Sequence, residues 1–263
     1  MKASPAEKLA SLRELLLRLK LPLLAEELGP RMTAAAHADA LPLLHELLML
    51  EAGDRHERKV TRLLKASHLP PAKTFASLDQ SVLPKPLVSR LHELALGDFV
   101  SNATNVLLFG LPGVGKTHAA CALGEALVRK GHSVLFTPTF RLVQELLVAK
   151  RDLALPRALR KLDLFDVLVL DDIGYVQQAP EEVEVLFTLL AERYERRSLV
   201  ITSNLVFSAW DRIFKNPMTT AAAIDRVVHH AVILEFGEEI PSFRTQATAT
   251  KPKRKEVQPM AGA

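Results

Sequence analysis

Residues 105–117 read Asn105-Val-Leu-Leu-Phe-Gly110-Leu-Pro112-Gly113-Val114-Gly115-Lys116-Thr117, an apolar β-prone run followed by a glycine-rich loop. The loop matches G-x-x-x-x-G-K-[ST] completely, and a helical segment over 117–130 follows it, as a P-loop requires. In such a loop the backbone N–H groups and the helix N-terminus face phosphate oxygens. We therefore predict a site for nucleotide phosphates, formed by Gly110, Pro112, Gly113, Val114, Gly115, Lys116, Thr117 and the adjoining His118.

Further β-rich runs alternate with helical segments on the C-terminal side of this loop. Together with the first run they cover 105–109, 133–137, 167–171, 198–202 and 231–235. Strands separated by helices form a parallel sheet with helices on both faces. The sequence therefore predicts an α/β domain over 105–245 with a five-stranded parallel sheet.

Two of these strands end in polar side chains that suit phosphate chemistry. The apolar strand 167–170 leads into Asp171 and Asp172, which is a Walker B arrangement. We expect Asp171 to hold Mg²⁺ together with Thr117, while Lys116 reaches the β- and γ-phosphates of ATP. Asp172 is expected to polarise the attacking water. Asn204 follows the strand 198–202 and is predicted to sense the γ-phosphate from the side opposite Asp172.

The regions on either side of this domain have different sequence patterns. Leucines at helical spacing, from Leu9 to Leu19, predict a small all-α domain over 1–70, with further helices over 41–50 and 55–66. Pro22 and Gly29-Pro30 are expected to end or kink the first helix. The proline-rich segment 71–104 is expected to be a linker with a short helix near 87–96, and 246–263 a disordered basic tail.

Composition sets limits on the class of protein. The chain has 263 residues, a net charge of +4 and an apolar content of 48%, so it can bury a core and accept an anionic partner. A single cysteine, Cys121, excludes a disulfide framework and a cysteine-rich zinc site, and it is expected to be buried packing. The nine histidines show no H-E-x-x-H spacing, so His229 and His230 are expected to pack or cap. Without a signal peptide or membrane span, the expected location is cytoplasmic.

The three motifs in this order resemble the AAA+ family of P-loop ATPases, and other runs are similar to its IstB-like branch. These runs are Asp172-Ile-Gly-Tyr175, Arg193-Tyr-Glu-Arg196, the segment 202–210 and the segment 222–231. Proteins of this branch are ATPase helper subunits of insertion-sequence transposases, related to DnaC-type helicase loaders and DnaA-type initiators. The resemblance covers about 75–244, and the helical N-terminal region also fits it.

The resemblance implies roles for two arginines. Arg226 matches an Asp-Arg pair whose arginine reaches the nucleotide of the neighbouring subunit, which implies a homo-oligomer. Arg244 resembles a residue near the sensor-2 position, although Phe243 stands where a tyrosine is usual. For each arginine, an ordinary surface position is the alternative. Asp172 stands where the family usually has glutamate, and its shorter side chain predicts slow hydrolysis.

A helical insert over 139–162 separates the second and third strands. Pro156 is expected to open a second helix there, on which Arg157, Arg160 and Lys161 share one face. In the initiator and loader branch an extra helix at this place contacts DNA, so the resemblance implies a DNA surface here. A solvated basic face is the alternative, and the basic segment 55–65 is a second candidate DNA or subunit contact.

The interpretation is an ATP hydrolase that binds Mg-ATP, assembles as a homo-oligomer on double-stranded DNA and helps a transposase in DNA transposition. A helicase loader, which has the same ATPase core but acts on single-stranded DNA, is the main alternative. A small-molecule kinase is disfavoured because the motifs end in sensor and arginine-finger positions. A nucleotide-dependent clamp that barely hydrolyses ATP stays open because of Asp172.

Overall fold

The computed structural model describes residues 5–34, 40–175, 179–214, 217–237 and 239–242. The chain divides into two compact units, Met1–Arg62 and Leu63–Ala263. The division falls inside a helix rather than at residue 70. Arg244 and the predicted tail 246–263 lie outside the described residues.

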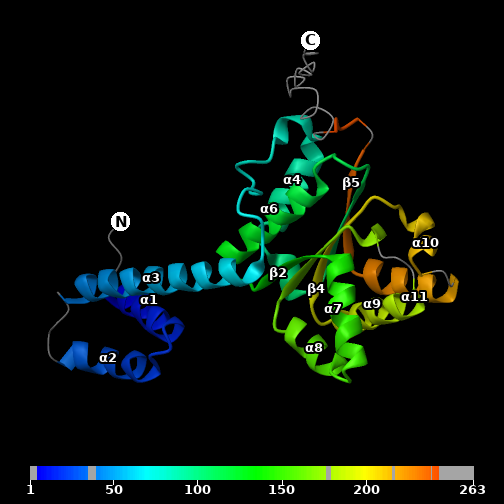
Figure 1. Cartoon of the computed structure of the whole chain (residues 1–263). Coiled ribbons are helices and arrows are strands. Elements are labelled where there is room, and N and C mark those ends of the chain that lie inside the picture. The colour runs from blue at the N-terminus through cyan, green and yellow to red at the C-terminus, as the bar shows by residue number, and fades with distance from the viewer. Residues whose placement is uncertain (1–4, 35–39, 176–178, 215–216, 238, 243–263) are drawn as a thin grey trace, which may run out of the picture. The chain divides into compact units, whose positions relative to one another are not determined.

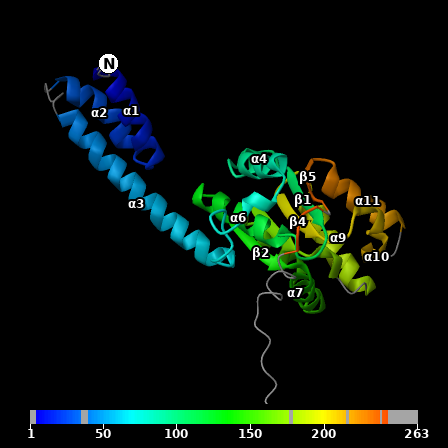
Figure 2. The same cartoon turned by 90° about the horizontal axis from the view of Figure 1, so that it is seen from above.

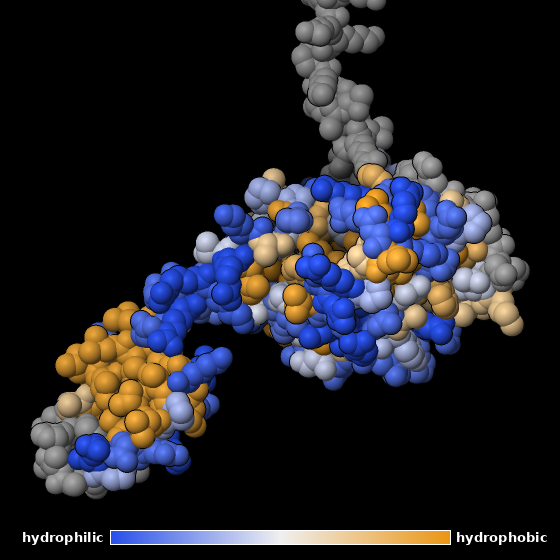
Figure 3. Space-filling view, turned by 60° about the horizontal axis from the view of Figure 1, so that its bottom comes forward, coloured by the Kyte–Doolittle hydropathy of each residue, from blue (hydrophilic) through white to orange (hydrophobic). Residues whose placement is uncertain are grey.

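The first unit is helical. It contains α1 (Pro5–Arg18), α2 (Pro22–Ala34) and most of α3 (Leu41–Ser67). Leu12, Leu15, Leu16 and Leu19 are buried, as expected from their spacing. Figure 3 shows an apolar area on this unit, coloured orange. The large apolar side chains that are exposed in this unit are Leu17, Leu23, Leu24, Leu43, Leu47, Met49 and Leu50.

Two expectations for the first unit are wrong. The helices expected over 41–50 and 55–66 form the single helix α3, which runs through Gly53. A glycine inside a helix costs only about 1 kcal/mol. The Arg55–Glu51 ion pair, at 2.5 Å, spans Gly53, and the Arg58–Asp54 pair, also at 2.5 Å, lies in the next turn. Pro30 lies inside α2 instead of ending a helix, whereas Pro22 begins α2.

The second unit contains the five-stranded sheet that the sequence predicts. Its strands are β1 (Asn105–Gly110), β2 (Val134–Pro138), β3 (Val167–Asp171), β4 (Ser198–Ser203) and β5 (Ala231–Phe236). They pair in the order β2-β3-β4-β1-β5, and every pairing is parallel. All carboxyl ends therefore meet at one edge, and the P-loop strand β1 lies beside β4.

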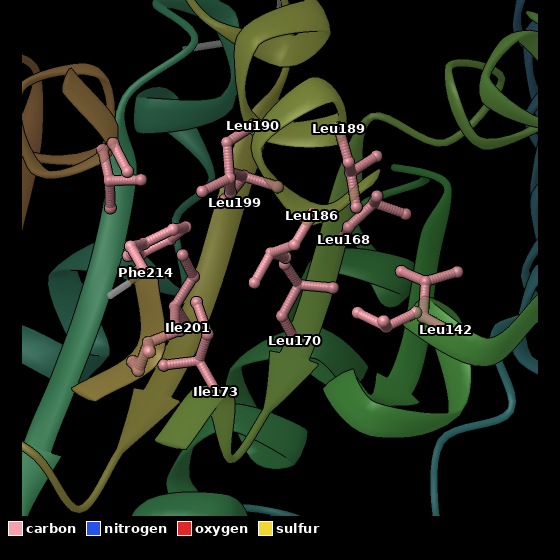
Figure 4. Close-up of a cluster of buried hydrophobic side chains, with 14 of the residues drawn as sticks. Leu142, Leu168, Leu170, Ile173, Leu186, Leu189, Leu190, Leu199, Ile201 and Phe214 are labelled. Carbon is pink, nitrogen blue, oxygen red and sulfur yellow. The ribbon is translucent and has the colours of Figure 1, made fainter. Parts of the chain in front are cut away.

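Helices cover both faces of this sheet, with α6 (Lys116–Arg129) and α9 (Pro180–Arg193) on opposite sides (Figures 1 and 2). The side with α9 also carries α7 (Thr139–Arg151), α8 (Leu155–Leu162), α10 (Asp211–Phe214) and α11 (Pro217–Val228). Figure 4 shows the core on this side, where Leu168, Leu170, Leu199 and Ile201 meet Leu186 and its neighbours on α9. Aliphatic side chains thus fill the space between the sheet and the helices on both of its faces.

Residues 71–104, expected to be a linker with a short helix, contain several elements. These are the 3₁₀ turn Gln80–Val82, α4 (Lys85–Leu94) and α5 (Asp98–Ser101). Leu78, Leu83, Leu87, Leu91 and Phe99 are buried, and α4 packs against α6. Much of this segment is therefore a packed part of the second unit.

Arg193 is the most deeply buried of the charged side chains that the structure describes in the second unit. Arg193, 1% exposed, donates hydrogen bonds to the carbonyl oxygens of Leu162, Phe165 and Ser198 at 3.0–3.1 Å. These carbonyls belong to the end of α8, the turn after it and the start of β4. Burial lowers the pKa of the Arg193 guanidinium to about 10, so it stays charged at neutral pH and ties these segments together.

Candidate nucleotide site

The P-loop joins β1 to α6 at the carboxyl edge of the sheet. Gly113 and Gly115 have φ angles of 90° and 97°, a region in which a side chain would be strained. Gly115 is the N-cap of α6 and supplies no side-chain hydrogen bond to the helix. No side chain of the cap residue thus covers the start of α6, and the helix dipole favours an anion there.

Lys116 is folded across this loop. The residue is 8% exposed, and its Nζ donates hydrogen bonds of 2.7 Å to the carbonyl oxygens of Gly110 and Leu111. A buried ammonium needs such partners, because leaving a charge unpaired in a protein interior is costly. The loop therefore holds the cation over the residues whose N–H groups would receive phosphate.

Asp171 joins the P-loop to the strand beside it. Its Oδ1 accepts a hydrogen bond from the Thr117 hydroxyl at 2.8 Å and another from the Thr202 hydroxyl at 2.7 Å. Thr202 Oγ1 also accepts the Asp172 backbone N–H at 2.8 Å. Three elements, α6, β3 and β4, thus converge on one carboxylate oxygen.

Asp172 and Asn204 face the same cavity from neighbouring strands. Asp172 has a φ angle of 59°, so the chain turns sharply just after β3. The Asn204 Oδ1 is buried, with no hydrogen-bond partner in the described part of the chain. It lies where a Cβ on Gly174 would be only 2.5 Å away, so glycine at 174 makes room for the amide. A buried acceptor without a donor costs free energy, so binding of a donor such as water is favoured there.

These groups surround a cavity of about 500 Å³. Most of the predicted residues line it: Pro112, Gly113, Gly115, Lys116, Thr117, His118, Asp172 and Asn204. The Gly110 carbonyl is held by Lys116, and Asp171 by Thr117, directly beside it. The Val114 side chain is instead buried, at 2% exposure, within the turn of the loop.

Sequence reasoning missed one wall of this cavity. Lys73, Ser77, Leu78 and Asp79 line it together with Thr202. His118 Nε2 lies 3.1 Å from both the Thr74 carbonyl oxygen and Ser77 Oγ, which fixes this segment to the first turn of α6. No spacing in the sequence pairs residues 74 and 118, and the prolines around 70 indicated only a linker.

Other predicted residues lie away from the cavity. The Arg226 guanidinium stacks 4.7 Å from the ring centre of Phe187 and donates to the Ala222 carbonyl of its own helix, α11. Arg157, Arg160 and Lys161 are exposed on α8, whose other face packs Leu155, Leu159 and Leu162 on the core. Cys121 is fully buried, and burial raises the pKa of its thiol to about 12, so it remains a packed, protonated side chain as expected.

The sequence is similar to those of several known proteins. The family model for IstB-like ATP binding proteins matches residues 14–250. The chain is 42% identical to an insertion-sequence ATP-binding protein of Sinorhizobium fredii over 249 residues, which cover 93% of this chain and 82% of the relative. It is 41% identical to the IS21 insertion-sequence ATP-binding protein of Pseudomonas aeruginosa over 192 residues, covering 73% and 72% of the two chains.

Solved structures share the fold at lower identity. DnaI superposes with a TM-score of 0.54 and 21% identity over 64% of this chain and 95% of its own. The DnaC helicase loader has a TM-score of 0.51 and 21% identity, over 66% and 98%. The replication initiator DnaA, bound to AMPPCP and single-stranded DNA, has a TM-score of 0.53 and 16% identity, over 66% and 53%. The second unit therefore has the P-loop fold of AAA+ proteins. No helix in the described ranges is long and apolar enough to cross a bilayer.

Proposed function

This chain belongs to the IstB-like ATP-binding proteins, and we propose that it is an ATP hydrolase that assembles on duplex DNA and helps a transposase in DNA transposition. The observation that carries the ATPase part is the convergence of Thr117, Asp171 and Thr202 on one oxygen, beside a cavity lined by Lys116, Asp172 and Asn204. The part played in transposition rests on the insertion-sequence names of the relatives.

The phosphates of ATP would bind where Lys116 now crosses the loop. The N–H groups of residues 113–117 and the dipole of α6 favour phosphate oxygens, and the Lys116 ammonium would exchange its carbonyl partners for the β- and γ-phosphates. The wall formed by Lys73, Ser77, Leu78 and Asp79 leaves room beside the phosphates for the rest of the nucleotide.

Mg²⁺ fits the donor set at the end of β3. Thr117 Oγ1 and Asp171 Oδ1 lie 2.8 Å apart, and hydroxyl and carboxylate oxygens are the hard ligands that Mg²⁺ prefers. Bound there, the ion would neutralise charge on the transferring phosphate. Thr202 keeps the Asp171 carboxylate turned toward Thr117 through its own hydrogen bond.

Asp172 and Asn204 would act on water. The Asp172 carboxylate is proposed to accept a proton from the attacking water, and the Asn204 amide to orient that water by the buried oxygen that lacks a donor. Both residues line the cavity in which the attacking water would lie. Slow turnover remains part of the proposal because the side chain is short.

Assembly and DNA binding are proposed to use surfaces away from the chain's own cavity. Arg226 does not line that cavity, which suits an arginine that completes the site of a neighbouring subunit. Arg157, Arg160 and Lys161 are exposed on a short helix anchored by its leucines, so they can reach the phosphates of a DNA strand. Arg55 and Arg58 are already paired with acidic residues, which makes α3 the second choice.

The proposal is tested by measuring phosphate release and sedimentation of the full chain with Mg-ATP, in the presence of duplex DNA, single-stranded DNA or neither. We expect large ATP-dependent assemblies and the greatest hydrolysis on duplex DNA. Assembly on single-stranded DNA alone would instead support the helicase-loader alternative. If DNA does not change the rate of hydrolysis and no assembly forms, both the transposition proposal and the helicase-loader alternative are contradicted.

A further inference from the structure

Three metal-ligating side chains meet at the edge of the sheet opposite the nucleotide cavity. Glu195 follows α9, while His229 and His230 lie between α11 and β5. One ligand atom from each lies within 4.8 Å of the others. Glu195 Oε1 is 3.8 Å from His229 Nδ1 and 3.6 Å from His230 Nε2. All three side chains are about half exposed, so an ion has access to them.

The two separations between the carboxylate oxygen and the imidazole nitrogens are close to those of a zinc site. With metal–ligand bonds of about 2.0–2.1 Å and tetrahedral angles, ligand atoms lie ~3.3 Å apart. The carboxylate oxygen is within half an ångström of that distance from both nitrogens. Two imidazoles and one carboxylate suit Zn²⁺ and its neighbours, whereas Mg²⁺ and Ca²⁺ prefer oxygen ligands throughout.

The backbone holds both parts of the cluster in place. The His230 carbonyl accepts the N–H of Asn105 at 2.7 Å, which ties the histidine pair to the first residue of β1. The His229 N–H donates to the Asp225 carbonyl at 2.9 Å. On the other side, the N–H groups of Arg196 and Arg197 both donate to the Arg193 carbonyl, closing the turn that presents Glu195.

Tyr194, Asp225 and Arg226 lie near the cluster. The Tyr194 hydroxyl lies 2.8 Å from His229 Nδ1. A metal ion on Nδ1 would take the lone pair that this hydrogen bond uses, so the Tyr194 hydroxyl would turn away from Nδ1 when the site is filled. Asp225 adds negative charge nearby, and Arg226 opposes it.

We propose that Glu195, His229 and His230 form a surface site for a divalent transition-metal ion of the Zn²⁺ type, separate from the Mg²⁺ site at Thr117 and Asp171. Three protein ligands leave the fourth tetrahedral position to water or to a group from another molecule. The proposal does not depend on ATP hydrolysis, because none of its residues lines the nucleotide cavity.

The test is a calorimetric titration of the tag-free full chain with Zn²⁺ alone, in buffer containing excess Mg²⁺ to occupy oxygen-only sites. We expect one Zn²⁺ per chain. Replacing a ligand, in Glu195→Gln or His230→Gln, should lower the affinity by more than the roughly 10- to 100-fold that loss of an outer-shell partner causes. Both positions are exposed, so these variants should keep the parent's thermal midpoint without zinc.

Two matched variants control for nonspecific binding. Glu192→Gln removes a carboxylate from the last turn of α9, and His56→Gln removes an exposed imidazole from α3; both should bind Zn²⁺ as the parent does. Co²⁺ in place of Zn²⁺ should give the visible absorption of a tetrahedral site in the parent and not in His230→Gln. Absence of zinc binding by the parent at micromolar protein concentrations, or unchanged affinity in both ligand variants, would overturn the proposal.

Discussion

The Thr202 hydroxyl donates a hydrogen bond to Asp171 Oδ1 over 2.7 Å and accepts one from the Asp172 N–H over 2.8 Å. One side chain on β4 therefore orients the carboxylate proposed to hold Mg²⁺ and the backbone of the residue proposed to polarise water. This coupling of adjacent strands is possible because β3 and β4 are paired in parallel and end at the same edge.

Thr202→Val keeps the shape of the side chain and removes both hydrogen bonds. Each bond contributes about 0.5–1.5 kcal/mol, so steady-state ATP hydrolysis should fall about tenfold or more, the change that ~1.4 kcal/mol produces. ATP affinity should change less. Thr188→Val, on α9, is the matched control and should hydrolyse ATP at the parent rate. Parent-like hydrolysis by Thr202→Val would show that the hydroxyl does not support the site.

Lys116→Ala removes the cation proposed to contact the β- and γ-phosphates. A hydrogen bond to a charged group contributes about 1.5–3 kcal/mol, so ATP affinity should weaken at least about tenfold. Equilibrium titration with a fluorescent ATP analogue measures this, and circular dichroism checks the fold. Lys130→Ala, just after α6, is the control. Unchanged affinity in Lys116→Ala would contradict the assignment of the P-loop.

Asp172→Asn removes the carboxylate proposed to polarise the attacking water while keeping its size. Hydrolysis should be abolished and ATP binding retained, so the ATP-bound assembly should persist. Asp172→Glu extends the carboxylate by one methylene and should raise the turnover rate. Phosphate release and nucleotide titration on the same samples separate the two effects. Hydrolysis at the parent rate in Asp172→Asn would assign the role to another residue.

Arg226→Ala tests whether one subunit completes the site of the next. The variant should hydrolyse ATP slowly, as should Lys116→Ala. In mixtures, a Lys116→Ala subunit still offers Arg226 to an intact neighbouring P-loop, so part of the phosphate-release activity should return. Full activity of Arg226→Ala alone would leave this residue as a structural partner of Phe187.

Replacing Arg157, Arg160 and Lys161 together with alanine tests the proposed DNA surface on α8. ATP-dependent binding to duplex DNA should weaken strongly and regardless of sequence, and the salt dependence should fall by about one unit for each lost phosphate contact. ATP affinity should stay at the parent value. The binding assay is run at about 150 mM salt, near physiological ionic strength.

The charge-matched control replaces Arg90, Arg129 and Lys130, which are exposed elsewhere on the second unit. Removal of the chain after Arg244 controls for the basic residues from Lys251 to Lys255. If the α8 variant binds duplex DNA as the parent does, the basic residues of α3 become the leading candidate surface.

The sequence by itself predicts the sheet, the P-loop and the acidic strand end. Each of these depends on local patterns: alternation of strands and helices, glycines at 113 and 115 whose positive φ the loop requires, and Asp171 at the end of an apolar strand. Local patterns also predict where α8 begins and which of its faces is exposed. They fail at Gly53, where α3 continues and the Arg55–Glu51 ion pair spans the glycine.

Only the tertiary structure decides which distant residues meet. The wall from Lys73 to Asp79 reaches the cavity because His118 holds it, and Thr202 reaches Asp171 because β4 lies beside β3. Glu195 meets His229 and His230 because the end of α9 and the start of β5 share an edge of the unit. In each case the partners are separated by about 30 residues or more, and the pairing comes from packing across the sheet, which no local spacing encodes.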